Sequence, residues 1–408
     1  MYKALLSSVQ NHCKFISSLP SLRNLAYSMY SSATKKQKTD QGYVVDFRSD
    51  TITKPTDAMR KAMSEAVVGD DVFGEDPTVN ELQRKVAKLL KKDAALFVPT
   101  GTMSNLIALM SHTTGRGEEV LLGDQCHIFD WEQGGMAQFA GVCPHVVKTL
   151  PDGTLDLDEL ESKIRPSDIH MASTRLICIE NTHNSSGGKV LPLEFLQKVR
   201  AIADKNNLKV HLDGARLLNA AVAMDVTPDV ITQYVDSISI CFSKGLGCPV
   251  GSALVGSNDF IARALRHRKA LGGGMRQCGI LAAAALVGLD QGYARLHVDH
   301  ENAQKFAKGM KELNNPVFTA KPENTQTNMV HILVREDIPS MQAASLLGNV
   351  ADDEISTLGQ SIQVKLFPET DHTMRAVMNH HITEKDVQMA LKKFKFIGEK
   401  LDKNGLGK

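Results

Sequence analysis

An acidic residue and a lysine follow two neighbouring strand-like segments near the middle of the chain. The strand-like residues 210–212 (V-H-L) lead into Asp213, and the strand-like residues 237–242 (S-I-S-I-C-F) lead to Lys244. The segment between them, 217–235, is long enough to form a helix and to return the second strand parallel to the first. Because α/β sheets bind ligands at the carboxyl ends of their strands, we expect both side chains at one binding edge.

A carboxylate and an amine at one sheet edge suit the chemistry of pyridoxal phosphate (PLP). The aldehyde of PLP needs a lysine for a Schiff base, and its ring nitrogen needs an acid to stay protonated. An acid about 4 Å from a cationic ring nitrogen contributes roughly 4 kcal/mol at an effective dielectric constant of 20, which holds the proton at pH 7. The alternative is a surface lysine and a helix-capping aspartate. We predict that Lys244 carries PLP and that Asp213 binds its ring nitrogen.

Longer motifs around these two residues resemble the threonine aldolase family. The resemblance begins with H-L-D-G-A-R at 211–216 and C-F-S-K-G-L-G-C-P-V-G-S at 241–252. Further motifs follow in the family's order: R-S-D-T-I-T-K-P-T at 48–56, G-D-D-V-F-G-E-D-P-T at 69–78, E-N-T-H-N at 180–184 and G-G-G-M-R-Q at 272–277. The similarity covers about residues 45–298 and is weaker after that.

The resemblance implies fold type I of the PLP-dependent transferases, an α/β fold. We therefore expect a large PLP-binding domain over 42–295, with a mostly parallel seven-stranded sheet flanked by helices. A small α+β domain is expected over 296–408. The family also implies a homo-oligomer, a tetramer built as a dimer of dimers, with active sites shared across the dimer interface.

Five further residues are expected to bind the cofactor. The strand-like residues 94–98 precede a glycine turn and a helix, an order that presents backbone N–H groups to an anion, so Gly101 and Thr102 should bind the phosphate. By the resemblance, His127 stacks on the PLP ring, and Arg276 reaches the phosphate of its own or a neighbouring subunit. Arg216 should contact both cofactor and substrate.

The resemblance also indicates how an amino-acid substrate is held. Ser49, Arg216 and Arg375 should bind its α-carboxylate, although 375–382 reads R-A-V-M-N-H-H-I, which departs from the family's motif. His183 is our candidate for the acid/base group, because an imidazole titrates near neutral pH. Its alternative role is a loop histidine bonded to a backbone carbonyl. Whether His127 or His183 takes the hydroxyl proton stays open.

The predicted reaction is retro-aldol cleavage of a β-hydroxy-α-amino acid, which gives glycine and, from threonine or allo-threonine, acetaldehyde. Two alternatives are a β-eliminating lyase of the same fold and a catalytically silent PLP-binding subunit. A nicotinamide-dependent dehydrogenase is disfavoured, because no G-x-G-x-x-G follows an N-terminal strand.

Composition narrows the remaining possibilities. A net charge of +1 and 42% apolar residues favour a soluble globular chain that binds neither nucleic acid nor membrane. The apolar run 280–289 is too short to cross a bilayer. The seven cysteines form no C-x-x-C pair and indicate reduced thiols inside the cell, and no metal-ligand spacing is present. Residues 1–41 are basic, serine-rich and nearly free of acids, as in a mitochondrial transit peptide or a disordered arm of a cytosolic protein.

Overall fold

The computed structural model describes residues 42–113 and 115–403. The predicted N-terminal extension, 1–41, lies outside these residues. From Val44 onward, the described residues belong to one compact unit. Within the described part of the chain, no helix is both long enough and apolar enough to cross a membrane.

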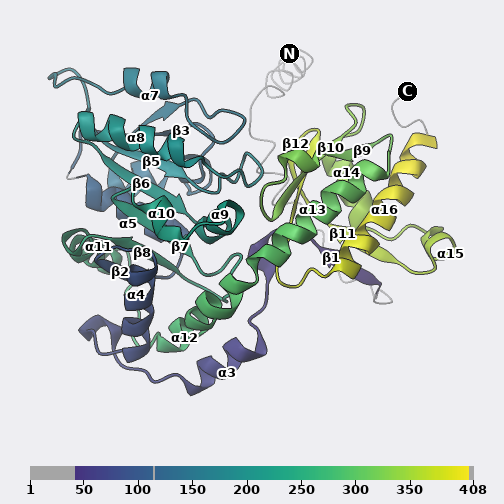
Figure 1. Ribbon diagram of the computed structural model, residues 1–408, viewed down its shortest axis with the longest axis horizontal. Coiled ribbons are helices and arrows are strands. Elements are labelled where there is room, and N and C mark those ends of the chain that lie inside the picture. Colours follow the sequence, from purple (N-terminus) through teal and green to yellow (C-terminus); the bar gives the residue numbers. More distant parts are fainter. Residues whose placement is uncertain (1–41, 114, 404–408) are drawn as a thin grey trace, which may run out of the picture. The chain divides into compact units, whose positions relative to one another are not determined.

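A seven-stranded sheet forms the framework for the predicted site (Figure 1), in the order β2-β8-β7-β6-β5-β3-β4. Its strands are β2 (Ala94–Val98), β3 (Glu118–Gly123), β4 (Cys143–Val147), β5 (Ser173–Glu180), β6 (Lys209–Gly214), β7 (Ser237–Cys241) and β8 (Ser252–Gly256). Neighbouring strands from β4 to β7 are parallel, whereas β8 is antiparallel to both β7 and β2. The mostly parallel seven-stranded sheet predicted from the sequence is confirmed.

Helices bury both faces of this sheet, because successive strand residues point to opposite sides. On β3, Leu121 joins one apolar cluster, whereas Val120 and Leu122 join another. The first cluster includes residues of α3 (Asp57–Glu65), α4 (Pro77–Leu89), α7 (Leu157–Ser162), α8 (Leu193–Lys205), α9 (Leu217–Met224), α10 (Pro228–Thr232) and α12 (Gly279–Val287). The opposite face is covered by α5 (Gly101–His112), α6 (His127–Asp130) and α11 (Asn258–Ala270). Two covered faces explain why the strands read as continuous apolar runs.

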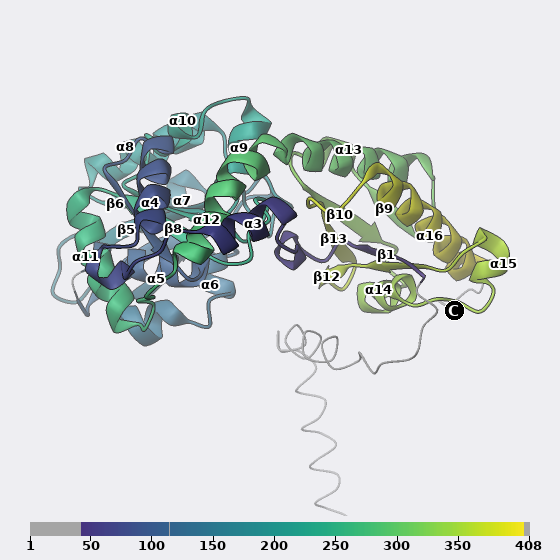
Figure 2. The ribbon, with the colours of Figure 1, turned by 90° about the horizontal axis from the view of Figure 1, so that it is seen from below.

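A second, four-stranded antiparallel sheet follows in the sequence, in the order β12-β13-β10-β9. Its strands are β9 (Phe318–Ala320), β10 (Met329–Val334), β12 (Phe367–Thr370) and β13 (Thr373–Val377). The helices of this region are α13 (Leu296–Glu312), α14 (Ser340–Gly348), α15 (Glu354–Leu358) and α16 (Glu384–Lys403), seen from below in Figure 2. His331 on β10 lies opposite Arg375 on β13, which places Arg375 in the middle of this sheet.

The segment that leads to Ser49 packs with the C-terminal strands. Strand β1 (Tyr43–Asp46) pairs with β11 (Ile362–Lys365), and the Phe47 amide donates to the Lys365 carbonyl at 2.9 Å. The Phe47 ring lies 5.1 Å from that of Phe306 on α13. This anchoring holds the following 3₁₀ turn, η2 (Asp50–Ile52), near β13, since the Val377 amide donates to the Phe47 carbonyl.

The predicted domain boundary at 295/296 falls between the two larger sheets, which are built from residues 94–256 and 318–377. The division into two domains stays a prediction.

Candidate active site

Asp213 and Lys244 lie at adjacent strand ends. Asp213 is buried on β6, where Oδ1 accepts the Ala215 amide at 3.1 Å and Oδ2 accepts Asn105 Nδ2 at 2.9 Å. Lys244 follows the neighbouring parallel strand β7 and is partly exposed. Burial raises the pKa of Cys241; Lys244 opposes this rise and Asp213 adds to it, so both charges act on one thiol. The two side chains therefore face a common site.

His127 stands beside Asp213 and is paired with a buried glutamate. Its Nδ1 lies 3.0 Å from Glu132 Oε1. A ring nitrogen of His127 and one carboxylate oxygen each of Glu132 and Asp213 lie within 4.8 Å of one another. Burial opposes protonation of His127, but the hydrogen bond to Glu132 and the charge of Asp213 outweigh it and raise the pKa of the imidazole. The positive charge of Lys244 opposes this rise in the pKa of His127, which again places the lysine at this site.

The turn after β2 leads directly into the N-terminus of α5, where the sequence predicts a phosphate site. Thr100 caps the helix, with its hydroxyl accepting the Met103 amide at 3.0 Å, and Thr102 is exposed. A Cβ atom on Gly101 would lie 2.7 Å from Cys241 Sγ, so only glycine fits against β7 at this point. The helix start thus lies at the same sheet edge as Lys244, with its first N–H groups available for a phosphate.

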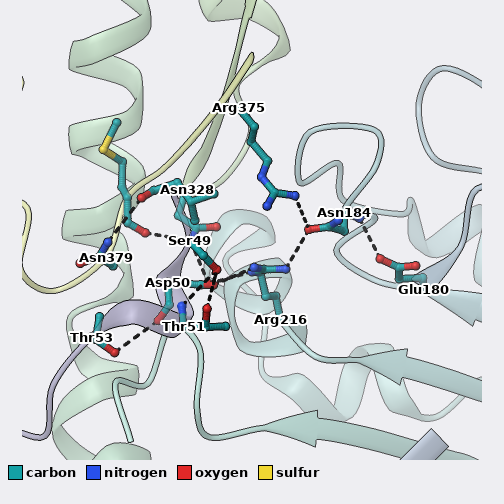
Figure 3. A network of polar contacts seen from close by, with 12 residues as sticks. Ser49, Asp50, Thr51, Thr53, Glu180, Asn184, Arg216, Asn328, Arg375 and Asn379 are labelled. Carbon is teal, nitrogen blue, oxygen red and sulfur yellow. Dashed lines mark hydrogen bonds and ion pairs between the residues drawn. The ribbon is translucent and has the colours of Figure 1, made fainter. Parts of the chain in front are cut away.

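Arg216 forms a buried ion pair with Asp50 (Figure 3). Arg216 Nε and Nη2 donate to the two carboxylate oxygens at 2.8 and 2.7 Å. Burial opposes the ionisation of Asp50, but the charge and hydrogen bonds of Arg216 outweigh it and lower the pKa of the carboxyl. Asn328 Nδ2 donates to Asp50 Oδ2 at 3.3 Å from the C-terminal region. Asp50 therefore holds Nε and Nη2 of the guanidinium, and the third nitrogen, Nη1, points to the site.

Arg375 approaches the same point from β13. Its Nη1 donates to Asn184 Oδ1 at 3.1 Å, and Arg216 Nη1 donates to the same oxygen at 3.2 Å (Figure 3). Glu369 Oε1 lies 3.2 Å from Arg375 Nη1. Burial lowers the pKa of Arg375; Glu369 opposes the shift and Arg216 adds to it. Arg375 Nε is buried and has no hydrogen-bond partner in the described part of the chain. Two cations thus converge on one neutral acceptor.

Ser49 lies at the edge of this group. Its hydroxyl caps η2, accepting the Thr51 amide at 3.2 Å and the Thr51 hydroxyl at 2.9 Å (Figure 3). Its neighbour Asp50 carries the ion pair with Arg216. The structure therefore brings Ser49, Arg216 and Arg375 into one polar network, and the carboxylate-binding role predicted for them stays a prediction.

Glu180, at the end of β5, connects this network to His127. Its Oε2 accepts the His127 amide at 2.7 Å and its Oε1 accepts the Asn184 amide at 2.9 Å. One buried carboxylate thus fixes the backbone of His127 and that of Asn184, which lies between the two arginines.

His183 and Arg276 are not drawn into these contacts. His183 is 2% exposed and lines a cavity of about 10 Å³ with Cys126, Leu191 and Phe195. Its Nδ1 accepts the Ser186 amide at 3.3 Å, and its Nε2 is without a partner among the described residues. Arg276 is half-exposed and pairs with Asp70 at 2.8 Å. Their predicted roles, acid/base catalysis and phosphate binding, stay predictions.

Sequence reasoning did not single out five residues that organise the site, namely Asp50, Asn105, Glu132, Glu180 and Asn184. Three of them stand inside the motifs at 48–56 and 180–184. For these three, the usable signal was a polar residue within a motif that also contains a predicted site residue. Asn105 and Glu132 carried no local signal, because their partners are distant in the sequence.

These residues fit PLP. A buried carboxylate, a lysine without a hydrogen bond or ion pair in the described residues, a partly exposed imidazole and a helix start share one sheet edge. The carboxylate would bind the ring nitrogen of the cofactor, and the lysine would bind its aldehyde. The imidazole would lie on the ring face, and the helix start would bind the phosphate.

The sequence pattern of the beta-eliminating lyase family matches residues 46–335. A low-specificity L-threonine aldolase of Escherichia coli K12 is 49% identical over 72% of this chain and 86% of its own length. Low-specificity L-threonine aldolase 1 of Arabidopsis thaliana is 45% identical over 86% of this chain and 95% of its own. The chain belongs to the threonine aldolase family.

Solved structures support the same fold for this family member. A putative L-allo-threonine aldolase from Listeria monocytogenes aligns with a TM-score of 0.69 at 21% identity, covering 83% of this chain and 92% of its own. A structure of SPT with PLP aligns with a TM-score of 0.66 at 16% identity, covering 95% and 99%. The family resemblance and the type I fold predicted from the motifs are both confirmed.

Proposed function

We propose that the protein is a PLP-dependent aldehyde-lyase that cleaves L-threonine and L-allo-threonine to glycine and acetaldehyde. The observation that carries this proposal is the convergence of Arg216 and Arg375 on Asn184 Oδ1, beside Asp213 and His127. An α-carboxylate is the substrate group that two such cations would bind. Curated aldolases 45–49% identical to this chain support the proposal.

The chain's own groups would hold the cofactor as follows. Lys244 supplies the amine for the aldehyde, Asp213 accepts the ring N–H, His127 covers the ring face, and Gly101 and Thr102 bind the phosphate. Bound there, PLP supplies an electron sink for the charge that develops at Cα of an amino acid. Arg276 would add a phosphate contact, in its own or in a neighbouring subunit.

The arginines determine which bond at Cα is cleaved. Arg216 and Arg375 bind the α-carboxylate, with Ser49 beside it, and Asn184 is the neutral acceptor that the carboxylate replaces. A carboxylate held at this point would orient the amino acid for cleavage of its Cα–Cβ bond. Because the pKa of Arg375 is lowered by burial and by Arg216, an anionic ligand is favoured over the neutral amide.

His127 would take the proton from the β-hydroxyl. With Nδ1 bonded to Glu132, Nε2 is the free acceptor, and the ring is partly exposed. His183 is nearly fully buried in a cavity with room for about one water, so it would act through that water or by holding the loop 183–189. This assignment chooses His127 where sequence reasoning favoured His183.

Product analysis with both threonine diastereomers tests the function. An aldolase releases glycine and acetaldehyde, whereas a β-eliminating lyase of the same fold releases 2-oxobutanoate and ammonia. Lys244→Ala is the control for dependence on the cofactor lysine. Formation of 2-oxobutanoate from the wild-type protein would replace the proposal with elimination, and no product from either diastereomer would favour a silent PLP-binding subunit.

We also propose a homo-tetramer, a dimer of dimers with shared sites. Mixing inactive Lys244→Ala with inactive Arg276→Ala chains restores activity if the sites are shared across an interface, and restores none if each chain is self-sufficient.

For the compartment, we propose the mitochondrion, with the cytosol as the alternative. Imaging of the full chain with a C-terminal fluorescent tag, compared with a chain starting at residue 42, distinguishes the two.

A further inference from the structure

A chain of buried polar side chains lies beneath Asp213, between α5 and the sheet. His112 Nε2 lies 2.6 Å from Ser237 Oγ, His211 Nδ1 lies 2.8 Å from the same hydroxyl, and His211 Nε2 lies 3.1 Å from Asn105 Oδ1. His211 and Ser237 are fully buried and Asn105 is 2% exposed. Residues 105 and 112 share one face of α5, and residues 211 and 213 share one face of β6. The helical repeat of α5 and the alternation of side chains on β6 therefore place this row of hydrogen-bonded side chains in line with Asp213.

Asn105 joins this chain to two carboxylates. Its Nδ2 donates to Glu132 Oε1 at 2.8 Å and to Asp213 Oδ2 at 2.9 Å, which uses both protons of one amide. Glu132 Oε1 is also the partner of His127 Nδ1. Burial and the charge of Asp213 raise the pKa of Glu132, which records the repulsion between the two acids. Asn105 is the neutral donor that separates them.

The hydrogen bonds of this chain can run in only one direction. The amide oxygen of Asn105 cannot face two carboxylates without repulsion, so its oxygen faces His211 and accepts a proton from Nε2. Burial lowers the pKa of His211 to about 4, so the ring is neutral and its Nδ1 must accept the Ser237 hydroxyl. Burial likewise lowers the pKa of His112 to about 3, and its Nε2–H then donates to Ser237 Oγ. Every donor points towards Asp213 and Glu132.

We propose that Asn105 is a positioning residue that presents Asp213 to the ring nitrogen of PLP and, through Glu132, holds His127 with its proton on Nδ1. The inference rests on the proposed function, because it concerns the same cofactor and the same base. With Asn105 in place, both carboxylates remain hydrogen-bond acceptors, and Nε2 of His127 stays free on the side of the substrate. Without Asn105, the two acids face each other directly, and a proton shared between them would weaken the ring-nitrogen contact.

Cofactor affinity gives a readout that does not depend on turnover. Trp131 is the chain's one tryptophan and directly precedes Glu132, so PLP added to the apoprotein should quench its fluorescence. We expect Asn105→Ala to raise the Kd for PLP by roughly 10- to 150-fold, the range for a lost hydrogen bond to a charged group. Asn105→Ser, which keeps one donor, should lie between Asn105→Ala and the wild type. Asn302→Ala is the matched control, since Asn302 is equally buried but donates to the Ile382 carbonyl.

The absorbance of the bound cofactor gives a second readout, its pH midpoint. Groups whose charges or hydrogen bonds reach Asp213 come from every surrounding element: Asn105, Cys126, His127, Glu132, Cys178, His211, Cys241 and Lys244. Asn105→Ala should move the midpoint by about one pH unit, equivalent to a tenfold change in proton affinity. Asn302→Ala should leave it unchanged.

The outcomes separate this inference from the proposed function. If the Asn105 variants match Asn302→Ala in Kd and in pH midpoint while the wild type cleaves threonine, the positioning role is wrong and the function stands. If the wild type binds PLP without cleaving threonine, the function is wrong and the same comparison still decides the role of Asn105. If Asn105→Ala does not fold, Asn105→Ser decides it by the same two measurements, and a wild-type Kd for Asn105→Ser would contradict the inference.

Discussion

Replacing Asp50 by asparagine removes one charge from the buried ion pair with Arg216 and little else. Asp50 is fully buried and accepts Arg216 Nε, Arg216 Nη2 and Asn328 Nδ2. An asparagine has the same shape but turns an NH₂ group towards a guanidinium that also only donates. Arg216 would keep its charge, because a guanidinium is not deprotonated in proteins. Without the carboxylate of Asp50, the burial of that charge would no longer be compensated.

The expected cost has two separate parts. Removing one partner of a buried ion pair destabilises the folded state by about 3–5 kcal/mol. Loss of the fixed orientation of Arg216 weakens one charge-assisted hydrogen bond to the substrate carboxylate, about 1.5–3 kcal/mol, which corresponds to a kcat/KM lower by roughly 10- to 150-fold. The first part acts on the free energy of unfolding, and the second on turnover at a temperature where the variant is folded.

The stability difference should also depend on pH. The pKa of Asp50 is lowered in the folded state, so its contribution is present above the unfolded value, near pH 4, and is lost as pH falls through the folded pKa. We therefore expect the wild type and Asp50→Asn to differ in unfolding free energy at pH 7 and to converge at lower pH.

Denaturant unfolding and steady-state kinetics with threonine measure the two parts. Glu354→Gln is the matched control, because Glu354 forms an equally buried ion pair with Lys393, remote from the site. The control should lose comparable stability and keep its kcat/KM. An Asp50→Asn variant that loses stability but keeps wild-type kcat/KM would refute the reasoning that Asp50 orients Arg216 for substrate.

Four further substitutions test other parts of the site. Lys244→Ala should leave the fold intact but release PLP on gel filtration, as measured by absorbance; retained cofactor would contradict its assignment. His127→Asn should lower kcat by about 10²- to 10⁴-fold and abolish the fall in kcat/KM on the acid side, which should begin above the ordinary histidine range because the pKa of His127 is raised. A larger loss in His183→Asn would reverse the assignment of the base. Gly101→Ala places Cβ against Cys241 Sγ and should raise the Kd for PLP roughly tenfold, measured by fluorescence titration; an unchanged Kd would mean that the phosphate site lies elsewhere.

Periodicity explains why the centre of the site was predictable from sequence. Asp213 and Lys244 follow apolar runs that can only be buried strands of an α/β sheet, and the chain between them is long enough for a parallel return. The same reasoning placed Gly101 at a helix start. The prediction of a single helix between these two strands was too simple, since two helices, α9 and α10, fill the segment.

The contacts that fix these groups were not predictable, because they join segments far apart in the chain. Asp50 and Arg216 are 166 residues apart, and Asn184 and Arg375 are 191 apart. The motif at 69–78 is acidic and contains two glycines, a composition typical of an exposed turn. Instead, Asp71 is buried against Arg268, and Asp76 is fully buried as the cap of α4. Burial of a charge depends on a partner that no local pattern reveals.

We expect reaction specificity to depend on the angle at which the α-carboxylate is held, because the two arginines proposed to bind it come from different sheets. Arg216 follows β6 of the seven-stranded sheet, whereas Arg375 belongs to β13 of the four-stranded sheet. Asn184 bonds to both, and Glu180 fixes its backbone to that of His127. A small change at any of these contacts would rotate the substrate about the ring and align a different bond at Cα.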